Sequence, residues 1–119
     1  MILGPNPAFD PDEALAIVEG DRDLFLELVI VFHENYPTEL SSIRDAIHQR
    51  DSEALRRAAH HLKGTLSALA AGPAFDAAAR LEDIGRNADL SKATALYAEM
   101  KRHVEALDAA ISDWSTDLI

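Results

Sequence analysis

Two adjacent histidines, His60 and His61, lie in the middle of a segment whose apolar spacing predicts a helix. Lys63 follows His60 by three residues and Gly64 by four, so both are expected one helical turn from the His60 ring. A neutral imidazole is a nucleophile, an ammonium can hold an anionic oxygen, and a glycine leaves space beside the ring. These residues predict a place where something large and anionic approaches the ring, and where Lys63 could hold a phosphoryl oxygen.

The apolar positions of the same helix determine where the two histidines point. Its inner face is expected to consist of Leu55, Ala59, Leu62, Leu66 and Leu69. On that arrangement His60 and His61 are both exposed, on opposite flanks of the helix. No aspartate or glutamate lies three or four residues from His60, so we expect a ring that works without the carboxylate of a hydrolase triad.

The preceding segments must also be helical if they are to support this site. Asp10 is expected to cap a short first helix that ends at Gly20, and Asp21 to cap a longer second helix. Pro37 lies inside the second helix, where we expect a kink or a break near Tyr36.

The histidine helix is expected to begin at Asp51 or Ser52 and to end at Gly72-Pro73, which also starts the next helix. The inner face of that next helix is expected to carry Ala74, Ala77, Leu81, Ile84 and Ala88. Asp89 or Ser91 should cap a last helix whose apolar positions continue to Trp114. Amphipathic helices joined by short turns predict an all-α fold: an antiparallel up-down four-helix bundle with a short additional N-terminal helix.

The composition limits the function classes. The chain has 119 residues, which we interpret as a flexible N-terminal segment at 1–8 and a single domain at 9–119. Its formal net charge of −10 argues against a nucleic-acid partner, because such binding depends on Lys and Arg. The sequence contains no cysteine, no apolar run long enough for a membrane span and no secretion signal, so we expect a cytoplasmic protein.

The segment Ala59-His60-His61-Leu62-Lys63-Gly64 resembles the A-H-x-L-K-G signature of the histidine-containing phosphotransfer (HPt) domain of two-component phosphorelays. The resemblance covers nearly the whole chain. It includes further comparable positions at Phe9-Asp10, Phe32 and Leu81-Glu82.

The resemblance implies that His60 takes a phosphoryl group from an aspartate of a receiver domain and passes it to another receiver. Lys63 would stabilise the phosphate and Gly64 would give access to the ring. The receiver would belong to a response regulator or a hybrid sensor kinase and would supply the Mg²⁺. This chain would be a monomeric carrier that has no ATP site of its own and binds no cofactor.

Other residues near the signature are candidates for contact with the receiver. They are Arg56, Arg57, His61 and Ser67. Ser67 is included because Thr65-Leu66-Ser67 departs from the asparagine-containing run that the family often has after the glycine. A partly exposed apolar patch beside His60, from Leu24, Leu28 or Val31 of the second helix, is a further candidate surface for the receiver.

Two other function classes remain open at this point. One is a non-catalytic helical-bundle module that binds or sequesters a receiver domain without taking phosphate. The other is a metal-binding bundle enzyme, for which His48 has Asp45 and Asp51 nearby, although this pair straddles a predicted turn. We expect no metal site. A kinase is excluded because the five glycines are scattered and form no phosphate-binding loop.

Overall fold

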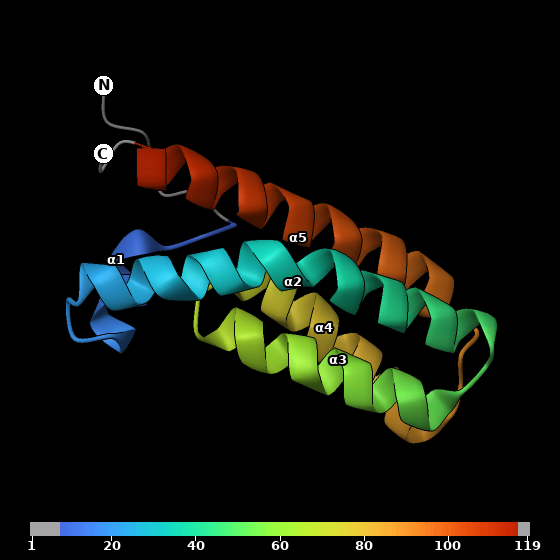
Figure 1. The fold of residues 1–119 in the computed structure, drawn as a ribbon. Helices are drawn as coiled ribbons and strands as arrows, with labels where there is room; N and C mark the ends of the chain where they lie inside the picture. Colours follow the sequence, from blue (N-terminus) through green and yellow to red (C-terminus); the bar gives the residue numbers. More distant parts are fainter. Residues whose placement is uncertain (1–7, 117–119) are drawn as a thin grey trace.

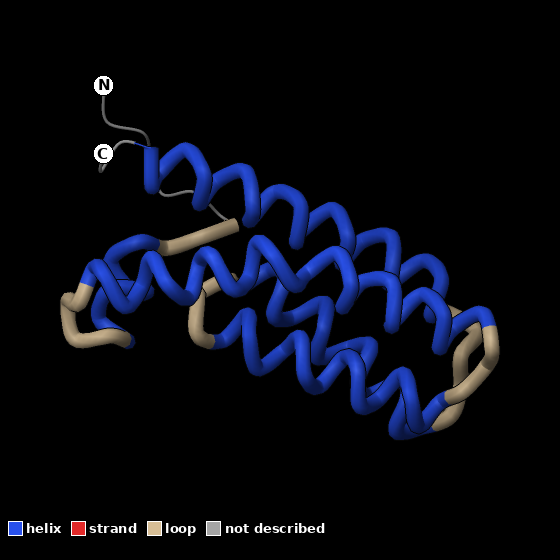
Figure 2. The backbone as a smooth tube through the Cα atoms, viewed as in Figure 1, coloured by secondary structure: helices blue, strands red, loops and turns tan. Residues whose placement is uncertain are grey.

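The computed structural model describes residues 8–116 of the chain. In that range the backbone forms helices and turns without a strand (Figures 1 and 2). The helices are α1 (Pro11–Ile17), α2 (Arg22–His48), α3 (Ser52–Ser67), α4 (Gly72–Asn87) and α5 (Ala93–Thr116). Helices α2 to α5 run alternately up and down, while α1 packs against α2 at one end of the bundle (Figure 1). The predicted all-α four-helix bundle with a short additional N-terminal helix is confirmed.

Three of the predicted helix starts are confirmed by hydrogen bonds. Asp10, Asp21 and Asp51 each accept a bond from the backbone N–H three residues later, with N···O distances of 3.0–3.1 Å. Each bond satisfies one of the backbone donors that the first turn of a helix leaves without a partner. The local sequence therefore starts α1, α2 and α3.

The predictions for two other helix ends are corrected. Helix α1 ends at Ile17 and not at Gly20. Gly20 closes the following turn with a φ of 80° and donates its N–H to the Leu15 carbonyl. Helix α5 begins at Ala93, so neither Asp89 nor Ser91 directly precedes it; the Asp89 carboxylate instead accepts the Ser91 N–H, at 3.1 Å, within the turn.

Pro37 does not break α2, which is one helix of 27 residues. Proline removes one backbone donor, and that loss is usually costly inside a helix. Buried side chains on both sides of it, at Phe32, Leu40 and Ile43, hold the flanking turns against the core. Tertiary packing therefore outweighs the local penalty.

The core follows the predicted inner faces closely, with one exception. All five residues predicted for the inner face of the histidine helix are buried. The predicted end of that helix at Gly72-Pro73 is wrong, however, because α3 ends at Ser67 and Leu69 lies in the turn that follows. On the next helix, however, Ile84 is only half-buried, and Ala88 is exposed just after the end of α4. Its buried face consists of Ala74, Ala77, Ala78, Leu81, Glu82 and Gly85.

Three aromatic rings pack against one another at the α1 end of the bundle. The Phe9 ring centroid lies 5.8 Å from those of Phe25 and Trp114, which are themselves 5.2 Å apart. Phe9 is buried, so the described structure already packs against the core at that residue. The predicted flexible segment 1–8 lies outside the described residues except for Ala8. No helix within residues 8–116 combines the length and apolar character needed to cross a bilayer.

Candidate functional site

His60 projects from α3 into solvent. Its side chain is 65% exposed, whereas Ala59 and Leu62 on the opposite side of the helix are buried. The apolar face of α3 predicted this exposure, and the structure confirms it. The ring is therefore accessible to another protein.

The expectation that no carboxylate attends His60 is wrong. The Nδ1 atom of His60 lies 3.1 Å from Oε1 and 3.2 Å from Oε2 of Glu82, which comes from α4 and is 22 residues away. Spacing along α3 alone does not reveal this partner, because Glu82 belongs to the adjacent helix. In the sequence, only the family resemblance indicates Leu81-Glu82.

Glu82 is the central residue of this site. Its side chain is only 4% exposed, and Oε2 lies 2.8 Å from Nζ of Lys63. Arg86, four residues further along α4, places Nη2 3.1 Å from Oε1. The Lys63 hydrogen bond, followed by that of His60, lowers the pKa of the Glu82 carboxyl below its ordinary value although burial opposes the shift. The carboxylate is therefore ionised at neutral pH.

An ionised carboxylate determines which ring nitrogen of His60 is free. A carboxylate only accepts hydrogen bonds, so Nδ1 of His60 must carry the proton that it shares with Glu82. In the neutral ring the lone pair is then on Nε2. The site thus orients an exposed imidazole with Nε2 as the nucleophilic atom.

The space around the ring agrees with the role predicted for Gly64. A Cβ atom on Gly64 would meet no atom within 4 Å, so this flank of α3 is open. Lys63 is 27% exposed and can reach both Glu82 and the solvent beside His60. Arg56, one turn before His60, is held by Glu53 through an Nη2–Oε1 contact of 2.6 Å.

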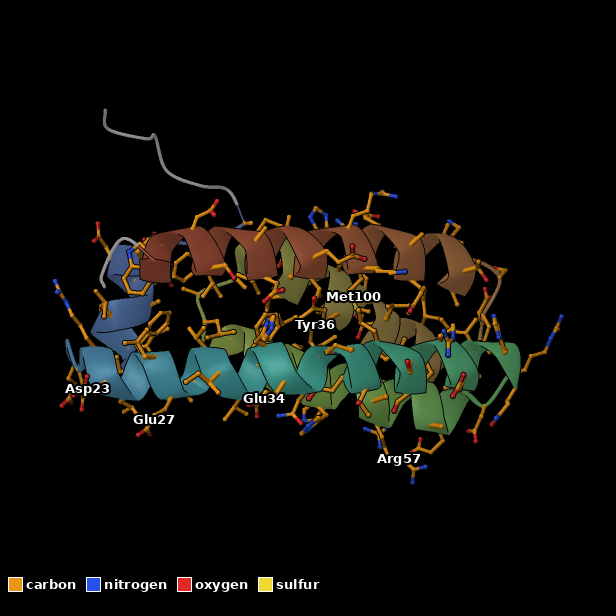
Figure 3. All side chains as sticks on the ribbon, turned by 45° about the horizontal axis from the view of Figure 1, so that its top comes forward. Asp23, Glu27, Glu34, Tyr36, Arg57 and Met100 are labelled. Carbon is orange, nitrogen blue, oxygen red and sulfur yellow. The ribbon has the colours of Figure 1, made fainter. Side chains whose placement is uncertain are left out.

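The other candidate residues do not join this cluster. His61 is 73% exposed on the α2 side of α3, where Nε2 lies 3.1 Å from Oε1 of Glu39. Arg57 lines a pocket with His61 and Glu39 and points away from the bundle (Figure 3). Ser67 lies at the end of α3, in a shallow groove with Phe75.

The apolar patch of α2 was predicted beside His60, but Val31 lies on the side of His61 instead, and Leu28 is half-buried. Leu24 and Val31 are exposed. Val31 shares a groove of about 430 Å³ with His61, Glu39 and other α2 and α3 residues. Burial raises the pKa of the Glu39 carboxyl, while the nearby His61 lowers it by less. The two histidines therefore face different surfaces: His60 faces α4 and His61 faces α2.

A metal site was the chemical alternative centred on His48. Within the part of the chain that the structure describes, no three His, Cys, Asp or Glu side chains gather closely enough to hold a metal ion. His48 is exposed at the end of α2, and the turn after it separates Asp45 from Asp51.

Comparisons with known proteins place this chain in a family. The sequence model of the Hpt domain matches residues 27–110, which include His60, Lys63 and Glu82. The phosphorelay intermediate protein rdeA of Dictyostelium discoideum is 25% identical over 113 residues, or 93% of this chain; the chain spans 44% of that relative's length.

The fold is also similar to that of a solved structure. The crystal structure of the histidine-containing phosphotransfer protein B (HptB) from Pseudomonas aeruginosa PAO1 matches with a TM-score of 0.86 and 25% identity. The match covers 93% of this chain and 96% of that one. With a family match over most of the sequence and the same helical fold, the chain belongs to the Hpt domain family.

Proposed function

We propose that this chain carries a phosphoryl group on Nε2 of His60 between the aspartates of receiver domains in a phosphorelay. The observation that carries the proposal is the exposed His60 ring, whose Nδ1 is held by the ionised Glu82. The donor and acceptor receivers belong to response regulators or hybrid sensor kinases. Membership of the Hpt domain family supports the same assignment.

The transfer step requires only groups that the two proteins supply. The lone pair of Nε2 attacks the phosphorus of an aspartyl phosphate, the P–O bond to the aspartate breaks, and the carboxylate leaves. The phosphorylated ring keeps its Nδ1 proton and becomes an imidazolium, whose charge Glu82 balances at 3.1 Å. The same step in reverse returns the group to an aspartate. In this proposal the receiver supplies Mg²⁺, and the chain is a carrier that needs no ATP site of its own because the phosphoryl group comes from an aspartyl phosphate.

The residues around the ring have separate roles in this proposal. Lys63 contacts a phosphoryl oxygen once the group arrives, and Gly64 leaves room for the receiver to approach. Arg56, Arg57, His61 and Ser67 remain candidate docking residues. Arg57 and His61 lie on the α2 flank, so a receiver that uses them must extend across α3. The monomeric state and the cytoplasmic location stay predictions.

The test is phosphotransfer from a receiver domain labelled at its aspartate. We expect the chain to take up an acid-labile, alkali-stable phosphate, which is typical of phosphohistidine. His60→Gln should abolish the label, and the matched variant His61→Gln should keep it. Normal labelling of His60→Gln would overturn the assignment, and loss of label only in His61→Gln would move the site to the neighbouring ring.

The same experiment tests the alternative of a sequestering module. That function predicts that the wild-type chain binds the receiver and takes up no label. It also predicts that His60→Ala leaves the affinity unchanged. The buried Glu82 that aligns the His60 ring favours the carrier, because a binding surface alone has no need of an oriented nucleophile.

A further inference from the structure

Arg86 has no role in the transfer step as described above, yet it contacts the same carboxylate as His60 and Lys63. Its Nη2 atom lies 3.1 Å from Oε1 of Glu82, on the oxygen that also faces His60. Lys63 contacts the other oxygen, at 2.8 Å. The side chain of Arg86 is 56% exposed, whereas that of Glu82 is almost completely buried.

In the phosphorylated state two anionic groups, Glu82 and the phosphoryl group, compete for the ammonium of Lys63. Without phosphate, the Lys63 ammonium is the closest partner of Glu82. With phosphate on His60, the strongly anionic phosphoryl oxygens attract the same ammonium. Movement of Nζ toward the phosphate weakens its 2.8 Å contact with a carboxylate that has little access to water. A buried carboxylate that loses its main cation is destabilised and tends to take up a proton.

Arg86 can prevent that loss because its own contact does not depend on Lys63. Its guanidinium remains charged at any pH that proteins tolerate. It is fixed at a second point, since Nη1 lies 2.7 Å from Oδ1 of Asp83. Arg56, another cation near the site, is held by Glu53 through two hydrogen bonds and is less suited to this role.

We propose that Arg86 is a positioning residue that keeps Glu82 ionised when Lys63 turns to the phosphoryl group. Glu82 then continues to accept the Nδ1 proton of His60 in the phosphorylated state. The inference rests on the proposed phosphotransfer function and assigns to Arg86 a role in the stability of the phosphorylated form.

The experiment compares Arg86→Gln with Arg86→Lys and with the control Arg80→Gln. Arg80 is an exposed arginine of the same helix, and it pairs with Glu99 at 3.7 Å. The first measurement is the equilibrium ratio of phosphorylated chain to phosphorylated receiver. We expect Arg86→Gln to lower this ratio about three- to tenfold, Arg86→Lys to restore most of it, and Arg80→Gln to leave it unchanged.

The second measurement is the pKa of the Glu82 carboxyl, followed by carbon NMR before and after phosphorylation. In Arg86→Gln we expect this pKa to rise on phosphorylation much more than in the wild type. A merely structural role of Arg86 would not produce a rise that depends on the phosphate. If both readouts in Arg86→Gln match those of Arg80→Gln, the role of Arg86 is overturned while phosphotransfer stands. Failure of the proposed function is detected separately, either by a wild-type chain that takes up no label or by label that persists in His60→Gln.

Discussion

A Cβ atom on Gly85 would lie 2.7 Å from the backbone nitrogen of Arg56 and 2.8 Å from the carbonyl oxygen of Ser52. The backbones of α4 and α3 therefore meet at this point without room for a side chain. Gly85 is three residues after Glu82, and Arg56 is one turn before His60. This close approach sets the separation across which Glu82 reaches the His60 ring.

Replacement of Gly85 by alanine should disturb both stability and transfer. The added methyl group meets backbone atoms, which cannot rotate away, so α3 and α4 must separate. We expect Gly85→Ala to lower the free energy of unfolding by about 1–3 kcal/mol, measured by urea denaturation. Labelling of His60 should also slow, because Glu82 moves away from Nδ1. Wild-type stability together with wild-type transfer would contradict the proposed importance of this contact.

Replacement of Gly64 by alanine should stabilise the fold, whereas replacement of Gly85 should destabilise it. Its flank is open, so alanine fits there and favours the helix by about 0.5–1 kcal/mol. Transfer from the receiver should nevertheless slow in Gly64→Ala and more strongly in Gly64→Leu, because the new side chain occupies the approach to His60. Gly72→Ala is the matched control, since a Cβ there also meets no atom within 4 Å. A Gly64→Leu variant that is labelled as fast as wild type would rule out the role in access.

Local signals in the sequence were sufficient for most of the fold. An aspartate before a helical pattern needs only the next turn to act as a cap, and Asp10, Asp21 and Asp51 all do so. The exposure of His60 was also predictable, because it depends only on the apolar face of its own helix. Of the kink or break expected near Tyr36, a break does not occur, because long-range packing stabilises α2 as a single helix.

The contact between His60 and Glu82 could not be derived from spacing along one helix, because it depends on how α3 and α4 pack together. A usable signal was nevertheless present. Glu82 follows Ala78 by four residues and Leu81 by one, and it precedes Gly85 by three, so it continues the apolar face of α4. A charged residue in that register indicates a buried partner. The predicted face contained Ile84 and Ala88 instead of Glu82 and Gly85, so the position of Glu82 on the buried face was missed.

Replacement of Glu82 by glutamine should separate charge from hydrogen bonding. The amide oxygen can still accept hydrogen bonds from Nδ1 of His60 or from Lys63, but it carries no charge to balance the imidazolium or the ammonium. We expect labelling of His60 to slow about five- to tenfold, because hydrogen bonds to charged groups are roughly twice as strong as neutral ones. Asp76→Asn, an exposed carboxylate of the same helix, is the control. Equal rates in the two variants would show that the Glu82 charge has no part in transfer.

The effect of Glu82→Gln on the free energy of unfolding should also depend on pH. Lys63 and His60 lower the folded-state pKa of Glu82 below the reference value of 4.5. Its contribution to stability is therefore present above about pH 4.5 and is lost as the pH falls through the folded-state pKa. In urea denaturation, the difference between wild type and Glu82→Gln should be largest near neutral pH and should shrink on acidification. A difference that is constant over this range would contradict the ion pairs described for Glu82.

A second histidine cluster joins α2 to α5 and should respond to pH in the opposite way. Nδ1 of His33 lies 2.7 Å from Oδ1 of Asp108, and the Tyr36 hydroxyl donates to Oδ2 of Asp108 at 3.1 Å. In Figure 3 Tyr36 lies between the two helices. The hydrogen bond and the charge of Asp108, followed by the charge of Glu34, raise the pKa of His33 above 6.5.

A raised folded-state pKa means that this pair stabilises the fold fully below about pH 6.5 and loses its effect as the pH rises through the folded-state pKa. His33→Gln should therefore lower the urea midpoint at about pH 5.5 and have little effect at about pH 8.5. The matched background is Asp108→Asn, in which His33→Gln should have nearly the same effect at both pH values. The Tyr36 hydroxyl is uncharged in this pH range, and Glu34 raises the pKa of His33 less than Asp108 does. If the pH dependence of His33→Gln persists in Asp108→Asn, the proposed role of Asp108 is wrong.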